Sequence, residues 1–145
     1  MEKVNNFEWE NLTHLNQEVA LIAINTASLY PYYLAACAKC AGAIKDGIIS
    51  DEVVINAFQP VVKMTLAYCR YTGNYIMQTW DDVRAVALYL YNSEKDDIIK
   101  DLVNGKEILK RPEIFETYCG GAGVHTCPGT LIYRAGEDPE YIPMN

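Results

Sequence analysis

Residues 50–71 read SDEVVINAFQPVVKMTLAYCRY, and they predict the longest helix of a mostly helical protein. Ser50 is a typical N-cap residue, and Asp51 and Glu52 follow it in the first turn, where the helix dipole favours negative charge. Pro60 interrupts the apolar run, and proline lacks the backbone N–H and clashes with the preceding turn. We therefore expect either a kinked helix or two abutting helices here.

The neighbouring segments carry the same helical signals. Residues 8–29 place apolar side chains at the i, i+3 and i+4 spacing of a helix face. Within them, residues 19–24 (VALIAI) are apolar all round, which predicts a position in the middle of a bundle. A break is expected near Tyr30, because Pro31 disfavours helical geometry in the residue before it. Thr79 then predicts the N-cap of another helix.

The last third of the chain gradually loses the helical pattern. Ser93 is expected to cap a short final helix that ends at Gly105. Beyond it, residues 130–134 are the one candidate extended segment. The sequence therefore predicts a single mainly α domain over residues 1–145, a compact helical bundle with Pro-kinked helices. In this prediction residues 106–145 form a loop-rich C-terminal extension that contains at most a short strand.

The composition limits the choice of partners and compartment. The 145 residues carry a net charge of −7, with 19 acidic and 12 basic residues, so direct binding of nucleic acid or of an anionic membrane is not expected. An acidic chain suits a basic protein partner. The N-terminal residues lack the pattern of a secretory signal, and an odd number of cysteines indicates free thiols in a reducing compartment. We therefore expect a cytoplasmic protein.

Residues 118–130 read YCGGAGVHTCPGT and raise the question of a metal or thiol site. Zinc ligands of the usual types are available from two parts of the chain: Cys37, Cys40, Cys119, His125 and Cys127. The first two lie in an alanine-rich helical segment, where cysteine often serves as a small buried hydrophobe. His125 and Cys127 are separated by one residue, so both side chains would point to the same side of an extended chain. That placement is the first requirement of a reactive thiol paired with a histidine. The favoured interpretation has no cofactor and a glycine-rich chain reversal, and zinc or a reactive thiol is the alternative.

Tyrosines and carboxylates supply the candidate partner-binding residues. Tyr68, Tyr71 and Tyr75 recur along one side of the predicted helix or its end, and tyrosine is common at protein interfaces. Asp97 and Asp101 form a like-charge pair at i, i+4, which costs a few tenths of a kcal/mol. Because this repulsion destabilises the helix, the presence of both carboxylates favours an acidic surface that is used for binding.

The motifs present and absent in the sequence favour a binding protein over an enzyme. It has two histidines in all, no serine nucleophile elbow and no phosphate loop before a helix, so an enzyme is not favoured. The leading prediction is a small acidic protein-binding module. An inhibitor or immunity-type factor is one example, encoded by a phage or mobile element and blocking a basic or nucleic-acid-binding protein. A second copy of the chain is the other partner that such a surface suits.

Overall fold

The computed structural model describes residues 7–73, 76–94, 97–110 and 129–143. Its helical elements are, in chain order, η1 (Trp9–Asn11), α1 (His14–Asn25), η2 (Ala27–Leu29), α2 (Tyr30–Lys45), α3 (Asp51–Tyr71), α4 (Trp80–Asn92) and α5 (Ile98–Val103). Its strands are β1 (Ile108–Lys110), β2 (Gly129–Tyr133) and β3 (Glu140–Pro143). The predicted mainly α class is confirmed.

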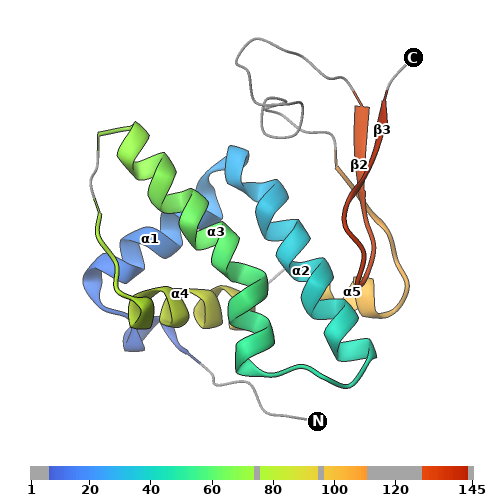
Figure 1. Cartoon of the computed structure of the whole chain (residues 1–145), viewed down its shortest axis with the longest axis horizontal. Helices are drawn as coiled ribbons and strands as arrows, with labels where there is room; N and C mark the ends of the chain where they lie inside the picture. The colour runs from blue at the N-terminus through green and yellow to red at the C-terminus, as the bar shows by residue number, and fades with distance from the viewer. Residues whose placement is uncertain (1–6, 74–75, 95–96, 111–128, 144–145) are drawn as a thin grey trace.

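The helical body is built around α3. This helix packs against α1, α2 and α4, whereas α5 and β2 pack against α2. Figure 1 accordingly shows α1, α3 and α4 on one side of α2 and the sheet on the other. Phe58 on α3 contributes to this core through edge-to-face contacts with the rings of Tyr33 and Tyr91, at 5.7 and 6.3 Å between centroids. The core therefore joins three helices through one aromatic cluster.

Two of the predicted helix starts are confirmed by their capping bonds. The Ser50 hydroxyl accepts a hydrogen bond from the Val53 N–H at 3.3 Å. At the start of α4, Thr79 accepts from the Asp82 N–H at 3.2 Å, and the Asp82 carboxylate accepts from the Thr79 N–H at 2.9 Å. This reciprocal pair satisfies two donors that a helix end would otherwise leave unpaired.

The predicted break near Tyr30 lies earlier in the chain, and at Pro60 the chain forms one helix and not two abutting helices. The chain leaves α1 at Thr26, where the backbone is extended, and the helix axis bends by 82° between α1 and the η2–α2 segment. Tyr30 is already helical, because Pro31 lies in the first turn of α2, where no N–H is needed. Pro60 lies within the continuous helix α3, on its exposed side, and Asn56, whose carbonyl loses the N–H of residue 60, is exposed as well. Water can therefore replace the missing donor.

The last helix begins later than predicted. Ser93 ends α4 instead of starting the next helix, and α5 begins at Ile98 after Asp97, which has a left-handed backbone with φ 55°. The Ile98 N–H donates to the Glu94 carboxylate at 2.9 Å. A glutamate side chain thus supplies the acceptor that was expected from the serine.

The C-terminal extension contains more strand than predicted. The candidate segment at residues 130–134 is confirmed as β2, but β2 is the central strand of a three-stranded antiparallel sheet in the order β1-β2-β3. Leu109 pairs with Ile132, and Leu131 pairs with Tyr141. The prediction of at most a short strand was wrong because the β1 partner of β2 lies far away in sequence, and a three-residue edge strand has too short a pattern to recognise.

The apolar face predicted within residues 8–29 comprises Leu12, Leu15, Val19, Ile22 and Ala23, and it is buried at Leu12, Val19 and Ala23 but not at Leu15. Leu15 is 42% exposed, and the buried positions are Asn16, Val19, Ala20 and Ala23. Asn16 can replace an apolar residue there because both polar groups of its side chain are hydrogen-bonded: its amide donates to the Asp82 carboxylate at 2.9 Å, and its carbonyl accepts from Gln78 at 2.6 Å. Residues 19–24 are consequently buried on one side only.

The turn between β2 and β3 is pressed against α2 through two glycines. The Gly136 N–H donates to the Ala38 carbonyl at 2.8 Å. A Cβ added at Gly42 would lie 2.4 Å from the Gly136 Cα, and Gly136 itself has φ 76°. Only glycine fits this approach, and the contact fixes the sheet to the helical body.

No individual helix in the described part of the chain has the length and apolarity that crossing a membrane requires. Only when α1 and the η2–α2 segment are taken together do the length and the apolar character suffice, and the two parts are bent by 82° relative to each other.

Candidate functional site

Two of the predicted zinc ligands are core residues. The Cys37 and Cys40 side chains are 0% exposed on α2. Burial raises the pKa of Cys40 to about 12, and burial together with the neighbouring Cys40 raises the pKa of Cys37 well above its usual value. Both are therefore protonated thiols at neutral pH, and neither is a ready nucleophile or metal ligand in the folded state.

The remaining zinc candidates cannot be placed. Cys119, His125 and Cys127 lie outside the described residues. Within the described ranges, no group of three or more His, Cys, Asp or Glu side chains gathers as a metal site. A zinc or thiol site at residues 119–127 stays a prediction.

The predicted acidic pair is engaged in the local structure of α5. Asp97 is the N-cap residue of this helix, and its carbonyl accepts from the Asp101 N–H at 2.8 Å. The Asp101 carboxylate lies 3.5 Å from the Lys106 ammonium. α5 packs on α2, on the opposite side of the molecule from the end of α3 that carries Tyr68 and Tyr71 (Figure 1). The structure therefore does not bring the two predicted halves of the binding surface together.

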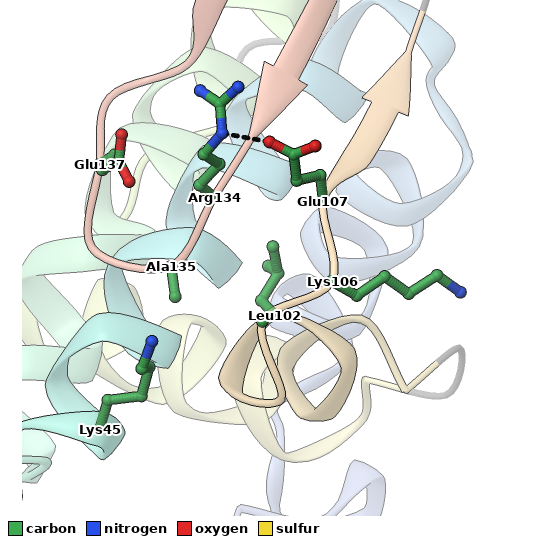
Figure 2. Close-up of a pocket in the computed structure, with 8 residues that line it drawn as sticks. Lys45, Leu102, Lys106, Glu107, Arg134, Ala135 and Glu137 are labelled. Atoms are coloured by element: carbon green, nitrogen blue, oxygen red, sulfur yellow. Dashed lines mark hydrogen bonds and ion pairs between the residues drawn. The ribbon is translucent and has the colours of Figure 1, made fainter.

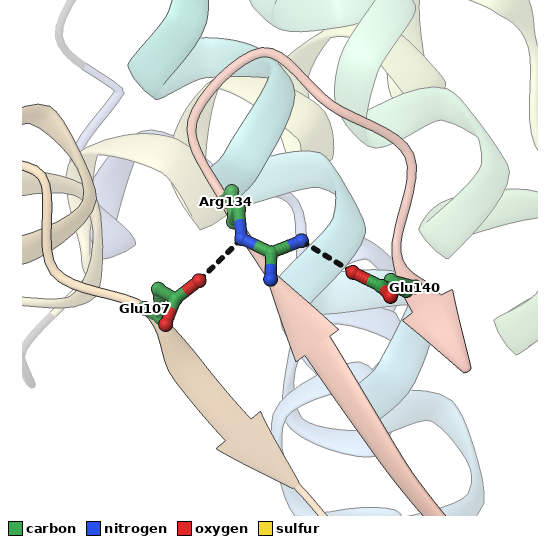
Figure 3. Close-up of polar contacts among 3 residues, drawn as sticks. All are labelled: Glu107, Arg134 and Glu140. Carbon is green, nitrogen blue, oxygen red and sulfur yellow. Dashed lines mark hydrogen bonds and ion pairs between the residues drawn. The ribbon is translucent and has the colours of Figure 1, made fainter. Parts of the chain in front are cut away.

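A charged cluster closes one end of the sheet. Arg134, at the end of β2, donates to the Glu107 carboxylate beside β1 and to the Glu140 carboxylate of β3, the latter at 2.7 Å (Figure 3). These two bonds raise the pKa of Arg134, so the guanidinium stays charged. The cluster joins all three strands.

The hollow beside this cluster is lined by opposite charges. It has a volume of about 340 Å³ and lies between the ends of α2 and α5 and the sheet (Figure 2), and its lining residues are Lys45, Leu102, Gly105, Lys106, Glu107, Arg134, Ala135 and Glu137. Arg134 is already paired with two carboxylates, and Lys106 is paired with Asp101. The lining therefore presents no concentrated charge of one sign that would select an ion, and we assign it a structural role.

The exposed side of α3 carries an apolar stripe. Its residues are exposed and fall at the i, i+4, i+7, i+8 and i+11 spacing of one helix face, and we call them the α3 stripe: Pro60, Met64, Ala67, Tyr68 and Tyr71. Tyr68 and Met64 are each 37% exposed, and Tyr71 is 90% exposed. Tyr75, the third predicted tyrosine, lies outside the described residues. The stripe is the surface on which two predicted partner-binding residues do lie together.

One edge of the stripe is basic. Lys63 and Arg70 are seven residues apart, so they lie on the same side of α3, next to the stripe. No aspartate or glutamate occurs from residue 53 to residue 80, although the whole chain has a net charge of −7. Burial and the charge of Glu18 on α1 raise the pKa of Cys69, which lies on the side of α3 away from the stripe. On α3 itself, the side chains beside the tyrosines are therefore basic and none is acidic from Val53 onward.

Sequence reasoning missed a second surface, where the end of α1 meets α2 and α4. Two adjoining hollows, of about 330 and 210 Å³, share the walls formed by Ile24, Asn25 and Tyr30. We call them together the tyrosine groove. The larger one is completed by Leu21, Ala23, Tyr33, Tyr89 and Ser93, and the smaller one by Thr26, Ala27, Pro31 and Lys110. Such a groove depends on the relative placement of three helices and a strand, which no local pattern encodes.

The groove has a definite internal geometry. The rings of Tyr30 and Tyr33 stack with centroids 6.0 Å apart. The Lys110 ammonium lies 5.3 Å from the Tyr30 ring centroid, a cation–π arrangement. Leu21 and Ile24 remain 46% and 45% exposed along one wall. The groove thus combines aromatic walls, aliphatic side chains open to water and a cation at one end.

Comparison with known proteins finds no matching family, no matching curated protein and no matching solved structure.

Proposed function

We propose that the protein is a protein-binding module and that the α3 stripe is its contact surface. The observation that supports this most directly is the exposure of Met64, Tyr68 and Tyr71 along one face of a helix whose opposite face forms the centre of the core. A stripe at this spacing matches the way in which an amphipathic helix packs against another helix. Tyrosine and methionine are also enriched at protein interfaces.

The residues beside the stripe define the chemistry of the partner at the contact. Lys63 and Arg70 favour a partner helix that carries an apolar stripe with an acidic edge. A second copy of the chain fits less well. In an antiparallel two-fold pair centred between residues 66 and 67, Lys63 of one copy would face Arg70 of the other, and like charges facing each other are unfavourable. The contact is therefore expected with a different protein.

The net charge of the chain predicts a basic partner, and this prediction is compatible with an acidic edge at the contact, because the two act at different distances. Net charge governs the approach of two proteins, whereas the residues flanking the stripe govern the contact itself. A partner that is basic overall and presents one acidic-edged helix satisfies both. An inhibitor or immunity-type role is one form of such a module and remains a prediction.

The test is selection from a displayed library of amphipathic peptides in which the positions beside the apolar stripe are randomised. We expect the selected peptides to be rich in Asp and Glu at those positions. Tyr71→Ala should weaken their binding by about tenfold or more, as for an interface anchor, without changing the unfolding temperature, because Tyr71 is 90% exposed. Leu109→Ala is the matched control, since Leu109 is 64% exposed on β1, away from α3.

Charge reversal provides the second part of the test. The double variant Lys63→Glu, Arg70→Glu should select basic-edged peptides instead. Selected peptides whose affinity is unaffected by Tyr71→Ala would contradict the assignment of the stripe. If the unmodified protein and the double variant select acidic-edged and basic-edged peptides equally, the proposed acidic edge of the partner is wrong.

A further inference from the structure

The turn between α5 and β1 contains the dipeptide Asn104–Gly105, which occurs once in the sequence. Asparagine is a thermolabile residue, and it loses its side-chain amide most readily before glycine, which has no Cβ to keep its backbone nitrogen away from the asparagine side chain. Both residues are exposed, so water reaches them. The dipeptide therefore has the chemistry for a covalent modification that needs no enzyme.

The reaction balances with water as its co-reactant. The Gly105 nitrogen gives up its proton and attacks the side-chain carbonyl carbon of Asn104. A new C–N bond forms, the bond to the side-chain nitrogen breaks, and that nitrogen leaves as ammonia. Water then opens the resulting five-membered succinimide ring at either of its carbonyl carbons. One opening gives aspartate. The other gives isoaspartate, in which the backbone runs through the side-chain carbon and is one carbon longer.

The fold holds this dipeptide in a conformation that prevents the attack. The Gly105 N–H donates to the Leu102 carbonyl at 3.0 Å. The Lys106 N–H donates to the Asp101 carbonyl at 2.9 Å, and Gly105 has φ 90°, which together make a Schellman turn. Asn104 has ψ 6°, so the Gly105 nitrogen is almost eclipsed with the Asn104 nitrogen and is turned away from the Asn104 Cβ. The reaction therefore requires the turn to open.

The end of α2 contains the same turn with an aspartate in the corresponding position. The Gly47 N–H donates to the Ile44 carbonyl at 3.1 Å, and the Ile48 N–H donates to the Ala43 carbonyl at 2.9 Å. Asp46 has ψ −1°, and Gly47 has φ 71°. Aspartate is thus compatible with this turn. Isoaspartate is not, because its additional backbone carbon changes the spacing between the groups that make the two hydrogen bonds.

We propose that Asn104 is a self-modification site whose rate is set by the opening of the α5 turn, and that its isoaspartate product loosens the junction between α5 and β1. The junction is held by two neighbouring ion pairs, from Lys106 to Asp101 and from Glu107 to Arg134 (Figure 2). β1 follows directly after Glu107, so a longer backbone at residue 104 displaces the groups that fix this strand. The site shares no residue with the α3 stripe, and the proposal does not depend on the protein-binding function.

Two measurements on the full chain test the control by the turn. Mass spectrometry follows the loss of the Asn104 amide in the folded protein and in urea, and NMR follows hydrogen exchange of the Gly105 N–H. Both processes need this N–H to be released from the Leu102 carbonyl. We therefore expect the folded state to slow the modification by the protection factor of the Gly105 amide, to within about threefold. Equal rates in the folded and unfolded chains would overturn the proposal, and so would a modification slowed far beyond the protection of the amide.

A pair of core variants separates local opening from general instability. Leu102→Ala removes a fully buried side chain of α5 and should accelerate the exchange and the modification by the same factor. Val61→Ala, at an equally buried position on α3, is the matched control and should change neither rate. Acceleration of the modification by Val61→Ala to the same extent as by Leu102→Ala would overturn the role of the turn.

The consequence for β1 is tested on the isoaspartate form, separated from the aged protein by ion-exchange chromatography. The amides of Ile108–Lys110 should exchange about tenfold faster in this form, as expected for the loss of roughly one hydrogen bond. Fresh Asn104→Asp protein should exchange like the unmodified protein. Asn104→Gln, whose longer side chain cannot close the five-membered ring, is the control and should give neither product. Unchanged exchange in the isoaspartate form, or equal loosening in Asn104→Asp, would refute the effect of the longer backbone.

Discussion

Replacing Gly42 by alanine should destabilise the protein, although the same change in the middle of most helices is stabilising by about 1 kcal/mol. The added Cβ would lie 2.4 Å from the Gly136 Cα and 2.7 Å from the Gly136 nitrogen. An ordinary contact of about 3.5 Å requires α2 and the β2–β3 turn to separate by roughly 1 Å. That movement stretches the 2.8 Å bond from the Gly136 N–H to the Ala38 carbonyl.

The expected magnitude combines these effects. Overpacking costs about 1–3 kcal/mol, the lost hydrogen bond adds about 1 kcal/mol, and the better helix propensity of alanine returns about 1 kcal/mol. The net loss in free energy of unfolding is about 1–3 kcal/mol. For a chain of this size the unfolding temperature should fall by roughly 3–10 °C.

Urea denaturation followed by circular dichroism measures the effect. The pair Lys39→Ala and Lys39→Gly calibrates helix propensity on the exposed side of the same helix. Gly47→Ala is the control for replacing a glycine where no clash results, since nothing lies within 4 Å of the added Cβ. Its φ of 71° makes its cost one of backbone strain alone. A Gly42→Ala protein as stable as the unmodified one, or more stable, would refute the glycine contact.

Three further predictions concern the hydrogen bonds of Asp82 and Asn16 and the two buried cysteines of α2. Hydrogen bonds from the Thr79 N–H, the Asn16 amide and the Thr79 hydroxyl lower the pKa of Asp82, so this carboxylate stabilises the fold above the ordinary aspartate pKa of about 3.9. That stabilisation should disappear as the pH falls through the lowered value, and a urea series at decreasing pH should show a shallower dependence for Asp82→Asn. Asn16→Ala should cost about 1–3 kcal/mol in the same assay, because it removes the hydrogen bonds of a buried side chain to the partly buried Asp82 and Gln78. Cys37 and Cys40 should react with iodoacetamide at neutral pH far more slowly in the folded protein than in urea, and fast labelling of either would contradict their burial.

The parts of the fold that local chemistry specifies could be predicted from the sequence. The starts of α3 and α4 were found from Ser50 and Thr79, because an N-cap bond involves residues only three positions apart. The buried face predicted within residues 8–29 was correct at Leu12, Val19 and Ala23, but it missed Asn16, because a hydrogen-bonded polar residue at a core position is not revealed by an apolar pattern.

Features that depend on distant residues could not be predicted in this way. Strand β1 is a strand only because it pairs with β2. The tyrosine groove exists only because α1, α2, α4 and β1 lie next to one another. Of the predicted binding residues, Tyr68 and Tyr71 lie on one side of α3, as their spacing predicted, because one helix carries both, and their role in binding stays a prediction. The spacing of the tyrosines did not reveal how exposed each one is, since that depends on which side of α3 packs against the other helices.

The position of β2 has a consequence for the order in which the protein is made. This strand contributes Leu131 and Tyr133, which are 1% and 0% exposed, to a core in which α5, ending at Val103, is the last helix that the structure describes. At a synthesis rate of about 5–20 residues per second, the last helix precedes these side chains by about one to several seconds. During that interval the nascent helices lack part of their interior and expose apolar surface to other chains. The rate at which a ribosome translates the final part of the message should therefore influence how much of the protein escapes aggregation.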